Sequence, residues 1–92
     1  MIILRTAGEV KAFLATPLGR QTEPILTPHL ERLAEFDFED IAAIAIREAG
    51  ESLSCLGLDP EGYEYRTDHA HFTEEVFVIG QDGWGWIIVT RT

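Results

Sequence analysis

The segment DHAHFTEE, residues 68–75, brings two histidines and three acids together within eight residues. If residues 63–72 form one extended strand, His69 and His71 point to the same face, because side chains alternate along a strand. Glu75 has the same parity if the strand continues. Two imidazoles and a carboxylate with open coordination positions suit Zn, Fe or Mn. His69, His71 and Glu75 therefore form a candidate metal site, and a polar connection with capping or solvated histidines is the alternative.

The same segment resembles part of the first motif of the cupin family. The matching positions are Gly62, His69, His71, Glu75, Gly80 and Gly83. This resemblance implies a metal bound by the two histidines and the glutamate. The gap before His69 is one residue longer than in the family, and the nine residues after Gly83 are too few for a second motif or a complete jelly roll. We therefore favour a protein without a bound metal or other cofactor.

No other arrangement predicts catalysis, so we expect a protein that is not an enzyme. Cys55 is the only cysteine, which excludes an internal disulfide, and its small apolar neighbours predict a packed thiol. Ser52 and Ser54 lack a base nearby in the sequence. The glycines of GQDGWG do not form a dinucleotide fingerprint, because that motif requires a following helix.

The negative charge is concentrated in one part of the chain. The formal net charge is −9, but residues 31–82 hold fourteen acids against three arginines, a net of −11, and the remainder has a net of +2. Such a block repels phosphates and anionic membranes, so a basic protein surface is the favoured partner and direct nucleic-acid binding is disfavoured. Solubility alone is the alternative explanation of the acidity.

The start of the chain lacks the basic region and long apolar stretch of a signal peptide. Its longest apolar run, IAAIAI, is far shorter than a membrane span. We therefore expect a soluble cytoplasmic protein that forms one α+β domain over residues 1–92.

The N-terminal half predicts an edge strand at MIIL and two short helices. Residues 8–16 show the spacing of an amphipathic helix, which Pro17 and Gly19 are expected to end. After a polar connection, Thr27 and Pro28 predict the cap and first residue of the next helix. His29 is then expected to be exposed.

The middle of the chain is ambiguous. Residues 39–49 allow a helix capped by Asp37, but alternation favours a strand over residues 43–48 after a helical start. We expect a helical turn or a strand over ESLSCLGL, a turn at DPEG, and a further strand at YEYRTD.

The C-terminal third predicts a β-hairpin. EEVFVIG and WGWIIVTRT are rich in β-branched and aromatic residues, and Asp82-Gly83 between them favours a tight turn. Trp84 and Trp86 share one face, which is expected to pack on the helices, unless one ring stays exposed as an interface anchor. The predicted fold is two or three short helices packed on a small antiparallel sheet built around this hairpin. The opposite sheet face is also apolar, so if it lacks a cover it provides a partner or homodimer surface.

The ending EEVFVIGQDGWGWIIVTRT resembles that of small acidic proteins of unknown function from plasmids, phages and other mobile elements. The similarity is carried by Glu75, Val76, Val78, Asp82, Gly83, Trp84 and Gly85. The segment REAGESLSCLG is similar to the Gly-acid-Ser/Thr-Leu sequence that often precedes this hairpin in those proteins. The resemblance implies a mobile-element accessory protein and no particular activity.

These patterns predict a non-catalytic acidic protein-binding module. In its sharpest form it is a phage or plasmid inhibitor of a host nucleic-acid-binding defence protein, of the anti-CRISPR or anti-restriction type, whose carboxylates mimic phosphates. This hypothesis requires the acids to gather on one face. The candidate binding residues are Glu35, Asp37, Glu39, Asp40, Asp59, Glu61, Glu64, Asp68, Glu74, Glu75 and Trp84. The alternative is a small metal-binding protein or metal-dependent enzyme that uses His69, His71 and Glu75.

Overall fold

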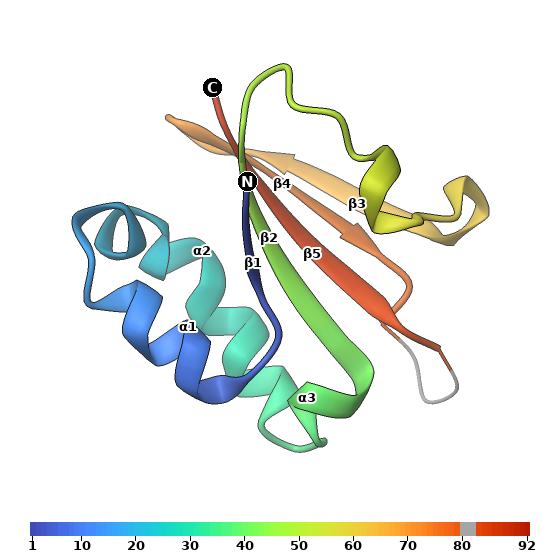
Figure 1. Ribbon diagram of the computed structural model, residues 1–92, viewed down its shortest axis with the longest axis horizontal. Helices are drawn as coiled ribbons and strands as arrows, with labels where there is room; N and C mark the ends of the chain where they lie inside the picture. Colours follow the sequence, from blue (N-terminus) through green and yellow to red (C-terminus); the bar gives the residue numbers. More distant parts are fainter. Residues whose placement is uncertain (80–82) are drawn as a thin grey trace.

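Residues 1–79 and 83–92 are described by a computed structural model, and they form one five-stranded sheet with three helices against one of its faces (Figure 1). The elements, in chain order, are β1 (Ile2–Leu4), α1 (Ala7–Leu14), α2 (Pro17–Leu33), α3 (Phe38–Ile41), β2 (Ala42–Glu48), β3 (Tyr63–Asp68), β4 (Phe72–Phe77) and β5 (Gly85–Arg91). Two 3-10 helices, Ser54–Leu56 and Pro60–Gly62, lie between β2 and β3. The α+β class expected from the sequence is confirmed.

The sheet is mixed, with strand order β1-β2-β5-β4-β3. The predicted C-terminal hairpin is present, since β4 and β5 pair antiparallel, and β3 and β4 form a second antiparallel pair. β2 and β5, however, are parallel neighbours, so the expectation of a purely antiparallel sheet is wrong. Parallel neighbours need a long connection, and here that connection contains the β3–β4 hairpin. Asp82 of the predicted turn lies outside the described residues.

The helices cover one face of the central strands. Alternate residues of β2 and β5 point to this side, and they pack with buried residues of α1 and α2. The members of this core that come from the central strands are Ala42, Ile44, Ile46, Ile87 and Val89. Each of these side chains is at most 3% exposed, so burial on this side is nearly complete.

The opposite face is covered by the connection from β2 to β3, not by the helices. Ala43, Ala45, Trp86 and Ile88 form the core on this side, and Leu53, Leu56 and Leu58 pack against it. The expectation that the tryptophan face packs on the helices is therefore wrong. The proposed reason for a homodimer, an uncovered sheet face, does not apply to these strands.

Cys55 is exposed, which contradicts the expected packed thiol. The segment that holds it crosses the sheet face and turns Leu53 and Leu56 inward. Cys55 lies between these two leucines in a 3-10 helix, so its side chain is left on the solvent side.

α2 begins eleven residues earlier than the sequence predicts, at Pro17 instead of Pro28. The N-cap is Thr16, whose hydroxyl accepts a hydrogen bond from the Gly19 amide at 3.0 Å. Thr27 does not cap a helix. Its hydroxyl donates to the Glu23 carbonyl at 2.8 Å inside α2.

Two prolines inside α2 each remove a backbone hydrogen bond, a cost that helix propensity alone does not offset. Burial of one helix face provides the compensation, because Leu26 and Leu33 are almost fully enclosed. No helix within the described residues combines the length and the apolar character needed to cross a membrane.

The ambiguous middle segment resolves as expected from its alternation. Asp37 precedes the four-residue helix α3, and the chain then becomes the strand β2. The predicted edge strand, the first helix and the strand YEYRTD are also confirmed, as β1, α1 and β3. The predicted turn at DPEG is a 3-10 helix.

We predict that Gly19→Ala destabilises the protein. A Cβ atom at this position would overlap the Phe13 carbonyl group at the close contact of α1 and α2. Overpacking of this kind costs about 1–3 kcal/mol, which denaturant unfolding would measure.

Gly8→Ala is the matched control. Its Cβ would meet only the Thr6 hydroxyl oxygen, 3.9 Å away, so this change should leave stability unchanged or raise it. Equal stability of the Gly19→Ala variant and the wild type would contradict the close packing of α1 and α2.

Candidate functional site

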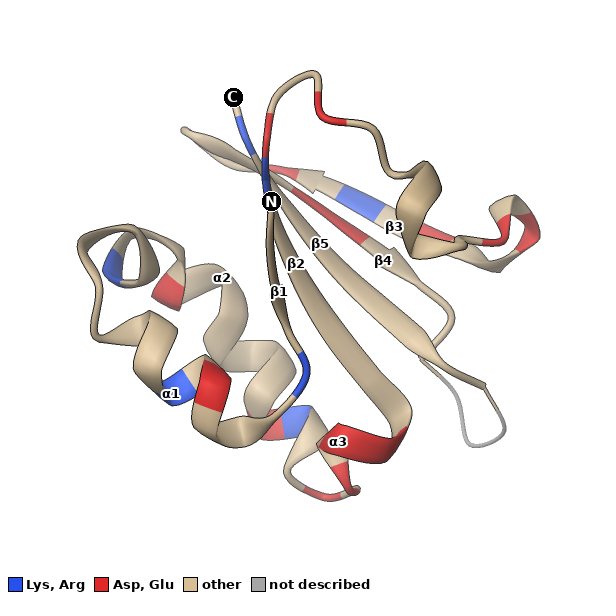
Figure 2. Cartoon of the chain, in the orientation of Figure 1, with Lys and Arg blue, Asp and Glu red and all other residues tan. Residues whose placement is uncertain are grey.

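The acids proposed from the sequence occupy several separate places (Figure 2). Glu74, moreover, is buried, with 8% of its surface exposed, so it cannot belong to an acidic surface. Glu35, Asp37, Glu39 and Asp40 lie at the junction of α2 and α3, Asp59 and Glu61 at the second 3-10 helix, Glu64 and Asp68 on β3, and Glu74 and Glu75 on β4. The structure therefore does not provide the single acidic face that the broad hypothesis requires.

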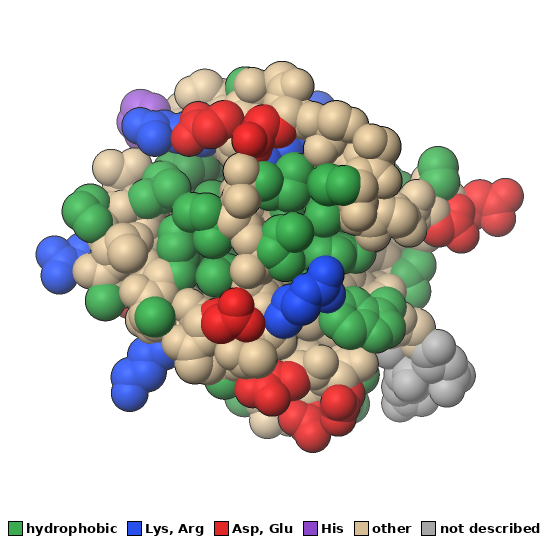
Figure 3. All heavy atoms as spheres, viewed as in Figure 1, with side chains coloured by type: hydrophobic (Ala, Val, Ile, Leu, Met, Phe, Trp, Pro, Cys, Tyr) green, Lys and Arg blue, Asp and Glu red, His purple; other side chains and the backbone are tan. Residues whose placement is uncertain are grey.

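One acidic group lies beside an apolar groove. The groove has a volume of 460 Å³ and runs between α1, the end of α2 and α3. Leu14 and Phe38 are among its apolar lining residues, and the charged residues that line it are Asp37, Glu39 and one cation, Lys11. The acidic side chains of this end of the molecule are visible along the lower edge of Figure 3. We call this feature the acidic groove.

The carboxylates at the acidic groove are crowded. The pKa of Asp37 is raised above its ordinary value, first by a side-chain hydrogen bond with Asp40 and by the negative charge of Asp40, with smaller contributions from burial and from Glu39. Glu39 also accepts a hydrogen bond from the Ala7 amide at 3.2 Å. Mutual repulsion at Asp37 and Asp40 means that an approaching cation would be favoured there.

Phe36 is a surface residue at this groove that the sequence interpretation missed. It lines the groove and is 52% exposed, whereas Phe38, two residues later, is 9% exposed and belongs to the core. Alternation would place positions 36 and 38 on the same side, so no alternation in the segment EFDFED could have separated the inward phenylalanine from the outward one.

Trp84 is exposed, which agrees with the alternative that one tryptophan ring stays on the surface. The charged group beside it is a cation, Arg5, and not one of the carboxylates. The ring is 51% exposed and lies 6.5 Å from the ring of Trp86. The guanidinium of Arg5 stands over both rings, 5.7 Å from Trp84 and 5.4 Å from Trp86. Arg5 therefore already occupies a position from which a partner's cation would contact these rings.

The candidate metal site is not assembled in the structure. β3 ends at Asp68, and His69 and His71 lie in the turn to β4, so the single extended strand assumed for residues 63–72 is wrong. The His69 amide donates to the Phe72 carbonyl at 2.8 Å and closes this turn. Glu75 pairs in register with Arg66 and Ile88, on the sheet face opposite the helices. Across the described residues, no three His, Cys, Asp or Glu side chains are placed to hold a metal ion.

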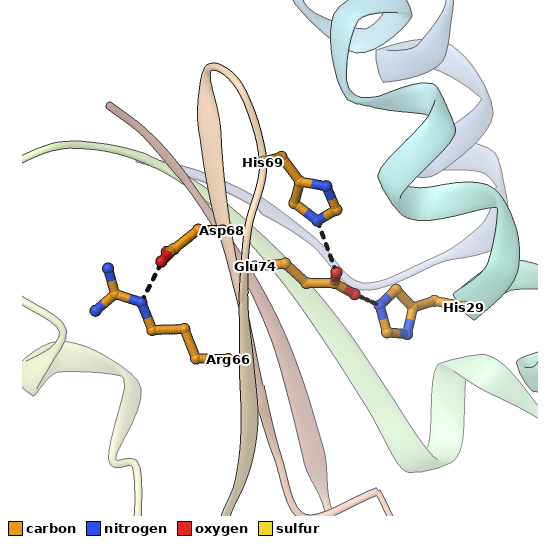
Figure 4. A network of polar contacts seen from close by, with 5 residues as sticks. All are labelled: His29, Arg66, Asp68, His69 and Glu74. Atoms are coloured by element: carbon orange, nitrogen blue, oxygen red, sulfur yellow. Dashed lines mark hydrogen bonds and ion pairs between the residues drawn. The ribbon is translucent and has the colours of Figure 1, made fainter.

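A different cluster joins two of the histidines. The Glu74 side chain points from β4 toward α2, where one carboxylate oxygen accepts from His29 Nε2 and the other accepts from His69 Nε2 at 2.9 Å (Figure 4). His29 is only 3% exposed, so the expectation that it is a surface residue is wrong. A buried carboxylate needs such donors, because an unpaired charge in the interior is strongly disfavoured.

The spacing of α2 explains the burial of His29. In a helix that begins at Pro17, Leu26, His29 and Leu33 fall on one stripe facing the sheet. A helix that begins at Pro28 does not contain Leu26, so only His29 and Leu33 of this stripe would belong to it. The early N-cap at Thr16 was therefore the signal needed to find His29.

A cavity of 260 Å³ adjoins this cluster and is lined by Tyr65 and Arg32 as well as by Glu74 and both histidines. The pKa of Tyr65 is raised, mainly by burial and then by the negative charge of Glu74, while the positive charge of Arg32 acts in the opposite direction. The cavity thus combines imidazole, phenol and guanidinium groups around one carboxylate.

Comparison of this chain with protein-family models, with curated proteins and with solved structures found no match.

We predict that His29 and Glu74 stabilise the fold as a pair. Replacing either one by leucine removes a partner from a buried charged contact and should cost about 3–5 kcal/mol. The double variant His29→Leu/Glu74→Leu should cost less than the sum of the two, with a coupling of about 1–3 kcal/mol in denaturant unfolding.

His71→Leu is the control, because His71 is exposed and should tolerate the same change within about 0.5 kcal/mol. Strict additivity of the His29 and Glu74 variants would show that the two side chains do not interact.

Proposed function

We propose that this protein is a non-catalytic binding module that docks a basic protein surface at the acidic groove. The observation that carries the proposal is the crowding of Asp37 and Asp40 beside an apolar groove and an exposed Phe36. Interfaces combine an apolar anchor with complementary charge in this way, and aromatic anchors supply much of their binding energy.

The proposed partner is a nucleic-acid-binding protein. Such proteins present Lys and Arg where they contact phosphates, and these cations suit closely spaced carboxylates. The net charge of −9 further favours encounter with a basic surface over a distance. A narrower form of the proposal, a mobile-element inhibitor that occupies the nucleic-acid site of a restriction or CRISPR protein, would have to act through the acidic groove alone, because the acids do not gather on one face (Figure 2).

The proposed contact is local to one end of the molecule. Phe36 takes the role of the anchor, because it borders the apolar groove and the crowded acids. Trp84 is the less suitable anchor, since Arg5 already stands over its ring where a partner's cation would lie. The acids on β3 and at the second 3-10 helix contribute attraction over a distance only.

The test is capture of the partner from host extract on immobilised full-length protein, followed by identification and affinity measurement. The variant Asp37→Asn/Asp40→Asn should weaken binding about tenfold or more, since each charged contact contributes about 1.5–3 kcal/mol. Binding should weaken with salt, and nucleic acid should compete with the module for the captured protein.

Glu61→Gln/Glu64→Gln is the matched control, because it removes the same charge from exposed positions away from the groove. It should weaken binding much less. Equal losses in the two double variants, binding that is insensitive to salt, or a partner that binds no nucleic acid would contradict the proposal.

A further inference from the structure

All three histidines of the chain line one cleft. The cleft lies between α2, the β3–β4 turn and the end of β5, where two adjoining cavities of 690 and 260 Å³ share the lining residues Pro24, Ile25 and His69. His71 lines the larger cavity and His29 the smaller, while His69 lines both. The cleft uses a different side of α2 from the acidic groove, because the two share no lining residue.

The charge of this cleft is opposite to that of the molecule as a whole. The chain has sixteen acids and seven Lys or Arg residues. Among the described residues that line the two cavities, Glu74 is the only Asp or Glu, whereas Arg32 and Arg91 are cations. The cleft is therefore a locally basic site in an acidic protein.

The Glu74 carboxylate already has hydrogen-bond partners within the protein. Both Glu74 oxygens accept hydrogen bonds from imidazoles, one from His29 and the other from His69. Since an ionised carboxylate can only accept, these contacts place the proton of each imidazole on Nε2. The second ring nitrogen of His69, Nδ1, takes no part in this contact, and the His69 side chain is 33% exposed. Glu74 thus orients His69 without competing for the cations of the cleft.

The two arginines are available at the cleft. Arg32 forms no ion pair with any residue in the described parts of the chain. Arg91 lies 3.5 Å from Glu48, and both side chains are more than half exposed, so water screens this contact. Guanidinium groups bind carboxylate and phosphate oxygens by paired, charge-assisted hydrogen bonds.

We infer that this cleft binds a small molecule through an oxyanion, a phosphate or a carboxylate group. Arg91 in the larger cavity and Arg32 in the smaller supply positive charge and hydrogen-bond donors, and His69, which lines both, is held in place by Glu74. Ile25 and Phe72 give the larger cavity an apolar wall. Its volume lies within the range of about 300–1,000 Å³ that small-molecule sites occupy. This inference is independent of the docking function proposed for the acidic groove.

The test follows the three histidine ring resonances of the full chain by NMR, during titration with inorganic phosphate and, separately, with acetate, at constant ionic strength. We expect a saturable shift of the His69 and His71 resonances. Saturation with phosphate alone would assign a phosphate ligand, and saturation with acetate alone would assign a carboxylate.

Arg32→Gln and Arg91→Gln should each weaken the binding about tenfold, as expected for loss of a charge-assisted contact. Lys11→Gln removes the same charge from the acidic groove, away from the cleft, and should have little effect. The absence of a saturable shift with either probe, or an equal loss in the Lys11→Gln variant, would overturn the inference.

Discussion

The parallel pair of β2 and β5 at the centre of the sheet determines where the helices and the connecting segments must pack. Both strands are buried on both faces, so each face must be covered by another part of the chain. The helices that precede β2 provide one cover, and the connection after β2 provides the other. Ala43 and Ala45 lie beside Trp86 and Ile88 in the register, so small side chains leave room for large ones on the second face.

This constraint also positions the two candidate binding regions. α2 packs along the helix-covered face of the sheet, so its two sides border different cavities. One side faces α1 and α3 and borders the acidic groove, and the other faces β3 and β4 and borders the cleft lined by the three histidines. Glu74 points into the helix-side layer at a strand position that an apolar residue would usually fill. His29 and His69 satisfy its charge, and the cluster ties the outer hairpin to α2 (Figure 4).

Local patterns predicted the strands well, because alternation and turn residues are short-range signals. The β4–β5 hairpin, the strand over residues 43–48 and the edge strand at residues 2–4 follow from them. The start of α2 was missed because Pro24 and Pro28 act against a helix locally, and only tertiary burial offsets their cost. His29 was expected to be exposed because the start of α2 was missed. The acidic groove could not be predicted from the sequence, because α1 and α3 come together only in the folded chain.

Docking of a basic protein at the acidic groove can be tested by a hydrogen-exchange map of the full chain with and without its captured partner. We expect new protection over residues 34–40 and over the flank of α1 that lines the groove, with little change in β3 and around Trp84. Protection confined to β3, to Trp84 or to the histidine cleft would contradict it.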